Sequence, residues 1–364
     1  MAGGRLIDIE VGPLVLESGA CLGRVRVRTG VWGELGAAEA VLVTHPLTAD
    51  ARAGAVDGEP GWWDALIGAG RLFDPERAPV VAMNVLGSCY GTTGPGDVGP
   101  DGEPWGLRFP VVTVRDMVRL EALALDRLGV GRLRLVIGGS LGGMQAAEWA
   151  RLYGDRVAKA VAIGATDRML PQALAWNAVQ RSAIVSDPAF DPRRPGPTAG
   201  LARAREIAMV TYRGDRSMER QFGRRLMPGA RSLELDAPSF MVESYLRHQG
   251  ERLRDRFCAL SYLVLIRAMD SHDTAAEGPG LPAAGASAPI VYVGISSDIL
   301  FPAERVRESA TEARRRGQAA SYLPFVSDYG HDAFLVEAGA LADVLRPALI
   351  DVLGADVRAT SPLR

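Results

Sequence analysis

A serine flanked by glycines stands at the junction between a predicted strand and a predicted helix, in residues 133–144 (LRLVIGGSLGGM). Within this segment Gly138, Ser140 and Gly142 form the pattern G-x-S-x-G, which between a strand and a helix is typical of a nucleophile elbow. The turn strains the serine backbone, so chain segments can pack around it only where side chains are small. The sequence therefore predicts an elbow that presents the Ser140 hydroxyl at the end of a strand.

The same position predicts how a negative charge near Ser140 would be stabilised. Because the serine begins a helix, the backbone N–H of Leu141 can point at an oxyanion that develops during attack. A second donor in such elbows comes from the loop that follows an early strand. Here that loop begins at His45, and because Pro46 has no N–H, we expect the donor to be the backbone of Leu47.

Short apolar segments bounded by turn residues alternate with helical patterns through most of the chain. Strands are predicted over residues 25–27, 40–43, 80–83, 133–137, 157–163, 290–295 and 321–325. Helices are predicted over residues 114–128, 302–316 and 332–353. This alternation predicts an α/β fold with a mostly parallel, doubly wound sheet.

The middle of the chain has a different character. Between residues 167 and 272 strand-like segments disappear and helical stretches rich in Arg, Ala, Leu and Met dominate. Residues 275–289 follow as a Gly/Ala/Pro-rich connector without periodicity. We therefore predict an α/β core, residues 1–166 and 286–364, interrupted by a helical lid insertion, residues 167–285.

A serine hydroxyl is a weak nucleophile at neutral pH and needs a general base that a carboxylate orients. In folds with this elbow the order along the chain is Ser, then Asp or Glu, then His. His331 is the one histidine that follows the last predicted strand, and Asp298 lies three residues after the strand before it. The sequence thus predicts Ser140, Asp298 and His331 as a catalytic triad. His248 and His272 fall in the insertion, where surface or packing roles are expected.

Composition narrows the function further. The net charge is −2 and the arginines are interleaved with acidic residues, which does not favour a nucleic-acid partner. Three scattered cysteines fit neither a disulfide framework nor a metal site, which favours a reducing, cytoplasmic location. The sequence contains no uninterrupted apolar stretch of about 18 residues, so no membrane-spanning helix is predicted. Neither a phosphate-binding glycine loop nor a zinc spacing occurs, so no metal and no tightly bound cofactor are expected.

Several longer motifs resemble those of the homoserine O-acetyltransferase family, α/β-hydrolase-type enzymes that acylate homoserine or serine. The resemblance covers nearly the whole chain and rests on residues 14–19 (LVLESG), 84–95 (NVLGSCYGTTGP), 108–110 (RFP), 115–116 (RD), 139–145 (GSLGGMQ), 211–213 (TYR), 243–250 (ESYLRHQG), 296–302 (SSDILFP) and 330–335 (GHDAFL).

The resemblance implies an α/β-hydrolase fold and a ping-pong acyl transfer in methionine biosynthesis. Acetyl-CoA, a substrate and not a held cofactor, would acylate Ser140, and the hydroxyl of L-homoserine would take the acyl group. By motif, Arg205 and Tyr212 would hold the amino-acid acceptor, and Asp332 would face its ammonium group. A fork-shaped guanidinium suits a carboxylate, and a carboxylate suits an ammonium. The resemblance also implies a homodimer formed through the helical lid.

One motif departs from the family pattern. The oxyanion loop usually reads His-Ala-Leu-Thr-Gly, whereas here it reads His45-Pro46-Leu47-Thr48-Ala49. Proline stiffens the turn, and alanine replaces a more permissive glycine, so an altered acyl pocket is expected.

Alternatives remain open from the residues alone. A serine esterase would share every triad residue, because a hydrolase and a transferase differ only in whether water or an alcohol captures the acyl-enzyme. L-Serine O-acetylation, O-succinylation and acylation of a secondary metabolite are further alternatives within the family. A binding protein without catalysis would predict a broken triad, which the sequence does not have.

Overall fold

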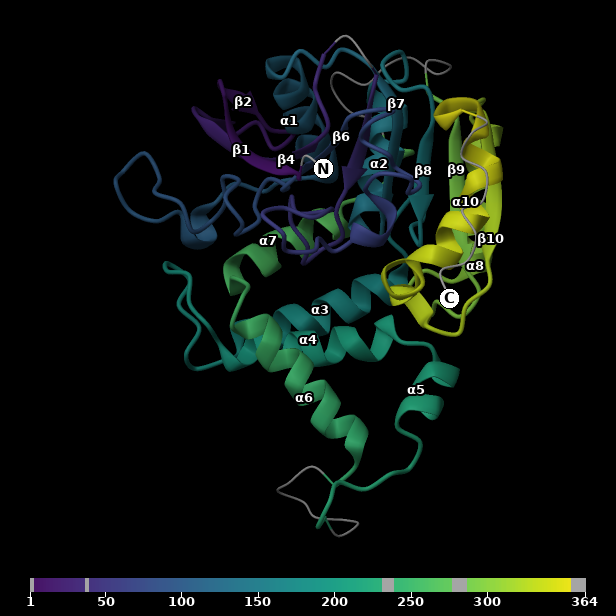
Figure 1. Ribbon diagram of the computed structural model, residues 1–364. Coiled ribbons are helices and arrows are strands. Elements are labelled where there is room, and N and C mark those ends of the chain that lie inside the picture. The colour runs from purple at the N-terminus through teal and green to yellow at the C-terminus, as the bar shows by residue number, and fades with distance from the viewer. Residues whose placement is uncertain (1–2, 37–38, 231–238, 277–286, 355–364) are drawn as a thin grey trace.

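The computed structural model describes residues 3–36, 39–230, 239–276 and 287–354. Its centre is an eight-stranded sheet in the order β1-β4-β6-β5-β7-β8-β9-β10 (Figure 1). The first three of these pair antiparallel, and the strands from β6 to β10 are parallel. The strands are β1 (Arg5–Val11), β4 (Val25–Trp32), β5 (Ala40–Thr44), β6 (Val80–Met83), β7 (Leu133–Gly139), β8 (Ala160–Ile163), β9 (Ile290–Ile295) and β10 (Ala320–Phe325), with a separate ribbon of β2 (Leu14–Val15) and β3 (Cys21–Leu22).

Helices cover both faces of the sheet, so its central strands are buried on both sides, as parallel strands require. One apolar cluster joins one face of the sheet to α1 (Val114–Arg127), α2 (Leu141–Leu152) and α8 (Ala303–Arg315). The cluster on the other face joins it to α10 (Ala338–Leu353) and to the loop that carries Trp63. Figure 1 shows α8 and α10 flanking β9 and β10.

The remaining helices lie between β8 and β9 in the sequence. Figure 1 shows α3, α4 and α6 side by side below the sheet. These helices are α3 (Pro171–Val185), α4 (Ala199–Tyr212), α5 (Asp215–Gln221), α6 (Met241–Arg254) and α7 (Ala259–Asp270).

The two ends of this helical segment are joined to each other. Met169 N–H donates to the carbonyl of His272 at 3.0 Å, and Thr274 N–H donates to the carbonyl of Asp167 at 2.7 Å. Arg115 reaches the same place, donating to the carbonyl of Asp273 at 2.5 Å. The segment therefore leaves and re-enters the core at a single point.

The α/β fold and its mostly parallel sheet are confirmed. Strands 80–83 and 290–295 have their predicted limits, whereas β8 starts at Ala160 because Val157 forms only an isolated bridge with Leu133. The single helix predicted over 332–353 is wrong: the chain turns at Glu337 (φ −111°, ψ 42°) between α9 (Ala333–Val336) and α10. Strand β1 was not predicted, and most of the connector predicted over 275–289 lies outside the described residues.

Candidate active site

Ser140 occupies a strained turn between β7 and α2. Its φ of 57° and ψ of −124° lie outside the ordinary regions for a residue with a side chain. The glycines around it are required by close packing, since a Cβ on Gly138 or Gly142 would lie 2.3 or 2.1 Å from the carbonyl oxygen of Thr44. The Thr44 hydroxyl also donates to the Gly142 carbonyl at 2.8 Å. The end of β5 therefore braces the elbow directly.

Asp298 and His331 form a buried pair. The His331 Nδ1 lies 2.6 Å from Asp298 Oδ2, which assigns the Nδ1–H tautomer and directs Nε2 away from the carboxylate. The other carboxylate oxygen, Oδ1, accepts from the N–H groups of Leu300 and Phe301 at 2.9 and 3.0 Å. Burial acts to lower the pKa of His331, but the charge and hydrogen bond of Asp298 outweigh it, so this pKa is raised.

Ser140 and the Asp298–His331 pair both lie next to the chain around Gly164, which directly follows β8. The Ser140 N–H donates to the Ile163 carbonyl at 2.9 Å. A Cβ on Gly164 would lie 3.3 Å from the His331 ring and 3.4 Å from Asp298 Oδ2. No hydrogen bond joins Ser140 to His331 within the described residues, and His331 Nε2 is buried without a partner there. Such bonds commonly tighten only when substrate is bound.

The two predicted oxyanion donors lie in buried backbone beside the elbow. Within the described chain neither the N–H of Leu47 nor that of Leu141 has a hydrogen-bond partner, which leaves both donors available. The loop is closed by Ala49 N–H donating to the Pro46 carbonyl at 3.1 Å, and Ala49 is not among the residues with positive φ. Alanine in place of the family's glycine therefore needs no left-handed backbone at position 49.

His45 anchors the oxyanion loop, a role that was not predicted. Its Nε2 accepts the Val85 N–H at 3.0 Å, and its Nδ1 lies 2.8 Å from the Pro46 carbonyl. Burial lowers its pKa, so the ring is neutral, with Nδ1–H as donor. The Gln145 side-chain amide donates to the His45 carbonyl at 3.3 Å. The loop is thus fixed both to the end of β6 and to helix α2.

The residues predicted to hold an amino acid also lie beside His331. The guanidinium of Arg205 lies 5.2 Å from the centre of the Tyr212 ring, and that ring lies 5.6 Å from the imidazole of His331. Arg205 has no carboxylate within 4 Å in the described chain, so it remains able to bind one. Burial raises the pKa of Asp332, while Arg205, His331 and Arg213 act to lower it.

The comparisons with known proteins agree with this arrangement. Residues 56–338 match the α/β hydrolase fold family. The homoserine O-acetyltransferase of Symbiobacterium thermophilum is 47% identical over 348 residues, which cover 92% of this chain and 91% of the relative. That of Geobacter sulfurreducens is 45% identical over 351 residues, covering 93% and 95%. The chain belongs to the homoserine O-acetyltransferase family.

Solved structures share the fold at lower identity. The homoserine O-acetyltransferase from Bacillus anthracis has a TM-score of 0.84 at 21% identity, covering 99% of this chain and all of that one. Esterase E22 also reaches 0.84, at 22% identity and covering 95% and 100%. Transferases and esterases therefore share this backbone, and the fold alone does not separate them.

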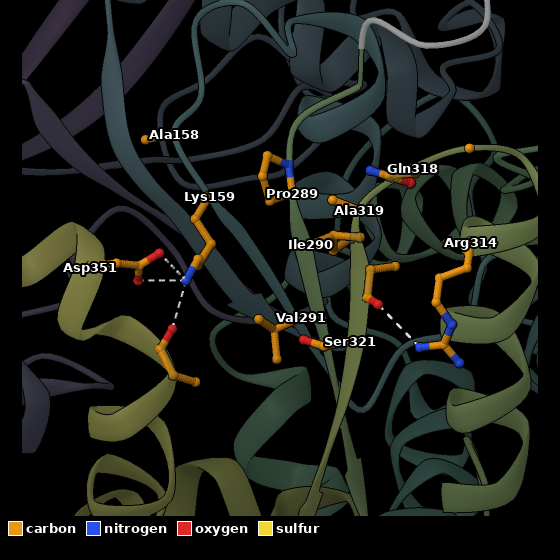
Figure 2. Close-up of a pocket in the computed structure, with 13 residues that line it drawn as sticks. Ala158, Lys159, Pro289, Ile290, Val291, Arg314, Gln318, Ala319, Ser321 and Asp351 are labelled. Carbon is orange, nitrogen blue, oxygen red and sulfur yellow. Dashed lines mark hydrogen bonds and ion pairs between the residues drawn. The ribbon is translucent and has the colours of Figure 1, made fainter.

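Other charged groups of this family member lie away from the site. A pocket of about 750 Å³ is lined by the beginnings of β9 and β10, at the opposite end of the strands from Ser140. Figure 2 shows the residues that line it. There Lys159 donates to Asp351 and to the Ala348 carbonyl, and Arg314 donates to the Ala320 carbonyl. Both cationic side chains therefore already have hydrogen-bond partners within the protein.

The remaining histidines stay outside the site, as expected. His272 is buried at the base of the helical segment, where its Nε2 lies 3.2 Å from the Thr166 carbonyl and its Nδ1 lies 3.5 Å from Glu148. Burial lowers its pKa to about 4. His248 is exposed on α6. Among the described residues no cluster of three or more metal-ligating side chains occurs, and no helix is long and apolar enough to cross a membrane.

Proposed function

We propose that this enzyme transfers an acetyl group from acetyl-CoA to the hydroxyl of L-homoserine through an acetyl-Ser140 intermediate. The observation that carries the proposal is the similarity, over more than nine-tenths of both chains, to proteins named homoserine O-acetyltransferase. Arg205, which lies beside Tyr212 and has no carboxylate within 4 Å in the described chain, supports an amino-acid acceptor. The reaction would contribute to methionine biosynthesis in the cytoplasm.

In the first half-reaction His331 Nε2 takes the proton of the Ser140 hydroxyl as the serine oxygen attacks the thioester carbonyl. The N–H groups of Leu47 and Leu141 stabilise the resulting oxyanion. Collapse of the tetrahedral intermediate breaks the carbon–sulfur bond, and the proton on His331 passes to the departing thiolate of CoA. Asp298 keeps the ring oriented and stabilises its charged form.

In the second half-reaction the hydroxyl of homoserine replaces CoA. Arg205 binds the carboxylate of the acceptor, Tyr212 packs beside it, and Asp332 faces its ammonium. His331 takes the proton of the hydroxyl, the oxygen attacks the acetyl carbonyl, and Ser140 leaves with that proton. Helices α3 to α7 act as a lid that limits access of water to the acyl-enzyme.

The test is acylation of the serine itself. With acetyl-CoA and no acceptor, the wild-type enzyme should gain the mass of one acetyl group on the peptide that contains Ser140, and Ser140→Ala should not. The variant should keep the thermal midpoint of the wild type while losing about 10⁶-fold in turnover, the order seen when such a nucleophile is removed. Full turnover by Ser140→Ala would refute the covalent mechanism.

An esterase is the second candidate, because esterase E22 has the same backbone. A panel of acetyl-, propionyl- and succinyl-CoA against L-homoserine, L-serine and water separates the alternatives. Acetyl-CoA and L-homoserine should give the highest kcat/KM for release of CoA. Equal release with water alone would identify a hydrolase, and a preference for serine or succinyl-CoA would identify one of the other acyltransferases.

We also propose a homodimer formed through the lid. Val179 and Val185 of α3 and Val210 of α4 are each between 44% and 52% exposed, which leaves apolar side chains on the surface of these helices. Light scattering should give the mass of two chains, and a single-chain mass would contradict the proposal.

A further inference from the structure

The turn between α4 and α5 packs directly on the loop that carries His331. A Cβ on Gly330 would lie 2.3 Å from the backbone nitrogen of Gly214, and a Cβ on Gly214 would lie 2.3 Å from the carbonyl oxygen of Asp328. Only glycines allow the two backbones to approach so closely, and Gly330 also has a φ of 72°. The lid and the loop of the catalytic base therefore meet backbone to backbone.

Arg213 lies within this turn and joins the same two parts. Its guanidinium carbon is 5.8 Å from the ring centre of Tyr245 in α6 and 5.8 Å from that of Tyr329, two residues before His331. Both distances are within the range of a cation–π contact. The arginine bridges a lid helix and the catalytic loop.

The hydrogen-bond partners of Arg213 are all neutral. It donates to the Tyr245 hydroxyl at 3.3 Å, to Gln221 Oε1 at 2.7 Å and to the Ser217 hydroxyl at 3.4 Å. No carboxylate of the described chain lies within 4 Å of it, so its positive charge is held in place without being neutralised. By contrast, Arg220, which lies beside Tyr329, pairs with Asp328 at 2.9 Å.

We propose that Arg213 is a positioning residue for the acceptor half-reaction: it holds the Tyr329–His331 loop against the lid, and its positive charge stabilises the carboxylate of Asp332, the residue after His331. The proposal rests on the proposed function, because it takes Asp332 as the partner of the acceptor ammonium.

The charges around Asp332 support this role. Burial is the largest influence and raises the pKa of the Asp332 carboxyl, Asp298 raises it further, and Arg205, His331 and Arg213 lower it. Arg205 is committed to the carboxylate of the acceptor in the proposed mechanism, and His331 is neutral when it acts as a base. Arg213 is then the remaining fixed charge that favours the ionised carboxylate.

Loss of the Arg213 charge should weaken binding of the acceptor ammonium. Without Arg213 the pKa of Asp332 rises, so more of the carboxyl is protonated at a given pH and the ammonium of the acceptor loses its counter-charge. The effect grows as the pH falls. Formation of the acyl-enzyme involves no amino acid, so it should be unaffected.

The experiment compares three variants with the wild type between pH 6 and 9. Arg213→Gln removes the charge, Arg213→Lys keeps it, and Arg220→Gln removes the neighbouring arginine, which acts on Asp328 instead. Three quantities are measured: the burst of CoA release from acetyl-CoA without acceptor, the KM for acetyl-CoA and the KM for L-homoserine. Thermal midpoints verify that each variant is folded.

Arg213→Gln should raise the KM for L-homoserine, and the ratio of the variant's KM to that of the wild type should be larger at pH 6 than at pH 9, because the loss of a positive charge raises the pKa of Asp332. The burst should stay within about twofold of the wild type, Arg213→Lys should recover most of the loss, and Arg220→Gln should resemble the wild type.

Four outcomes would overturn the proposal. An increase in KM that is equal at all pH values and in Arg213→Lys would indicate packing alone. A higher KM for acetyl-CoA or a lost burst would place Arg213 in the donor reaction. A wild-type enzyme that gives a burst but acetylates no amino acid would refute the proposed function and this inference together, whereas unchanged acceptor kinetics in Arg213→Gln would refute this inference only.

Discussion

Glu121 should make the stability of this enzyme fall as the pH rises. The side chain is 2% exposed between α1 and α2, where Oε2 accepts the indole N–H of Trp149 at 2.6 Å and Oε1 has no partner in the described chain. Burial raises the pKa of this carboxyl from 4.5 to about 8, and the bond from Trp149 opposes the rise only in part. Around neutral pH the folded protein thus holds a proton that the unfolded chain releases.

The size of the effect follows from proton linkage. Between the unfolded pKa of 4.5 and the folded value of about 8, the folded state binds one more proton, so the free energy of unfolding decreases by about 1.4 kcal/mol per pH unit. From pH 5 to pH 8 this amounts to at most about 4 kcal/mol. Glutamine has the shape of the protonated acid and can still accept from Trp149, so Glu121→Gln should remove this dependence.

The assay is urea denaturation at pH 5, 6, 7 and 8, with the free energy of unfolding of Glu121→Gln compared with that of the wild type. The two proteins should be similar at pH 5, and the variant should be increasingly more stable towards pH 8. Glu76→Gln is the matched control, because Glu76 is exposed, and it should follow the wild type at every pH. Parallel curves for Glu121→Gln and the wild type would show that Glu121 is ionised in the folded state and would refute the reasoning.

Two further predictions concern the site itself. Gly142→Ala should abolish acyl-enzyme formation or folding, because its Cβ would lie 2.1 Å from the Thr44 carbonyl oxygen, whereas Gly131→Ala, with no atom within 4 Å of the new methyl group, should behave as the wild type in circular dichroism and in the burst assay. Because Asp298 raises the pKa of His331 and the base must be neutral, the rate of acyl-enzyme formation should fall as the pH decreases through a value above 6.5. A midpoint below 6.5 would show that burial dominates.

The sequence predicted those parts of the site that depend on local order along the chain. The elbow at Ser140 requires glycines at fixed spacing, and Asp298 and His331 each follow a strand that apolar residues mark clearly. The structure brings Asp298 and His331 into contact and places Ser140 beside them. Their catalytic roles stay predictions until the variants are measured.

What the sequence did not predict depends on contacts between distant segments. His45 holds the oxyanion loop through the Val85 N–H, 40 residues away, and Arg213 meets Tyr329 only because two glycines allow the backbones to touch. Strand β1 had a local signal, the alternation of Ile7, Ile9 and Val11, but it lies at the edge of the sheet and carries acidic residues between them.

The joined ends of the helical segment bear on how the protein can change. The backbone N–H groups of Met169 and Thr274 bond to residues at the other end of the segment, His272 and Asp167. The more than one hundred residues between Met169 and Thr274 therefore form a loop whose two ends are held together by hydrogen bonds. Strands β8 and β9 keep their register, Ala160 opposite Ile290, whatever the length of that loop. We therefore expect that substitutions in the segment that carries Arg205, Tyr212 and Arg213 can change acceptor preference while Ser140 and the sheet stay as they are.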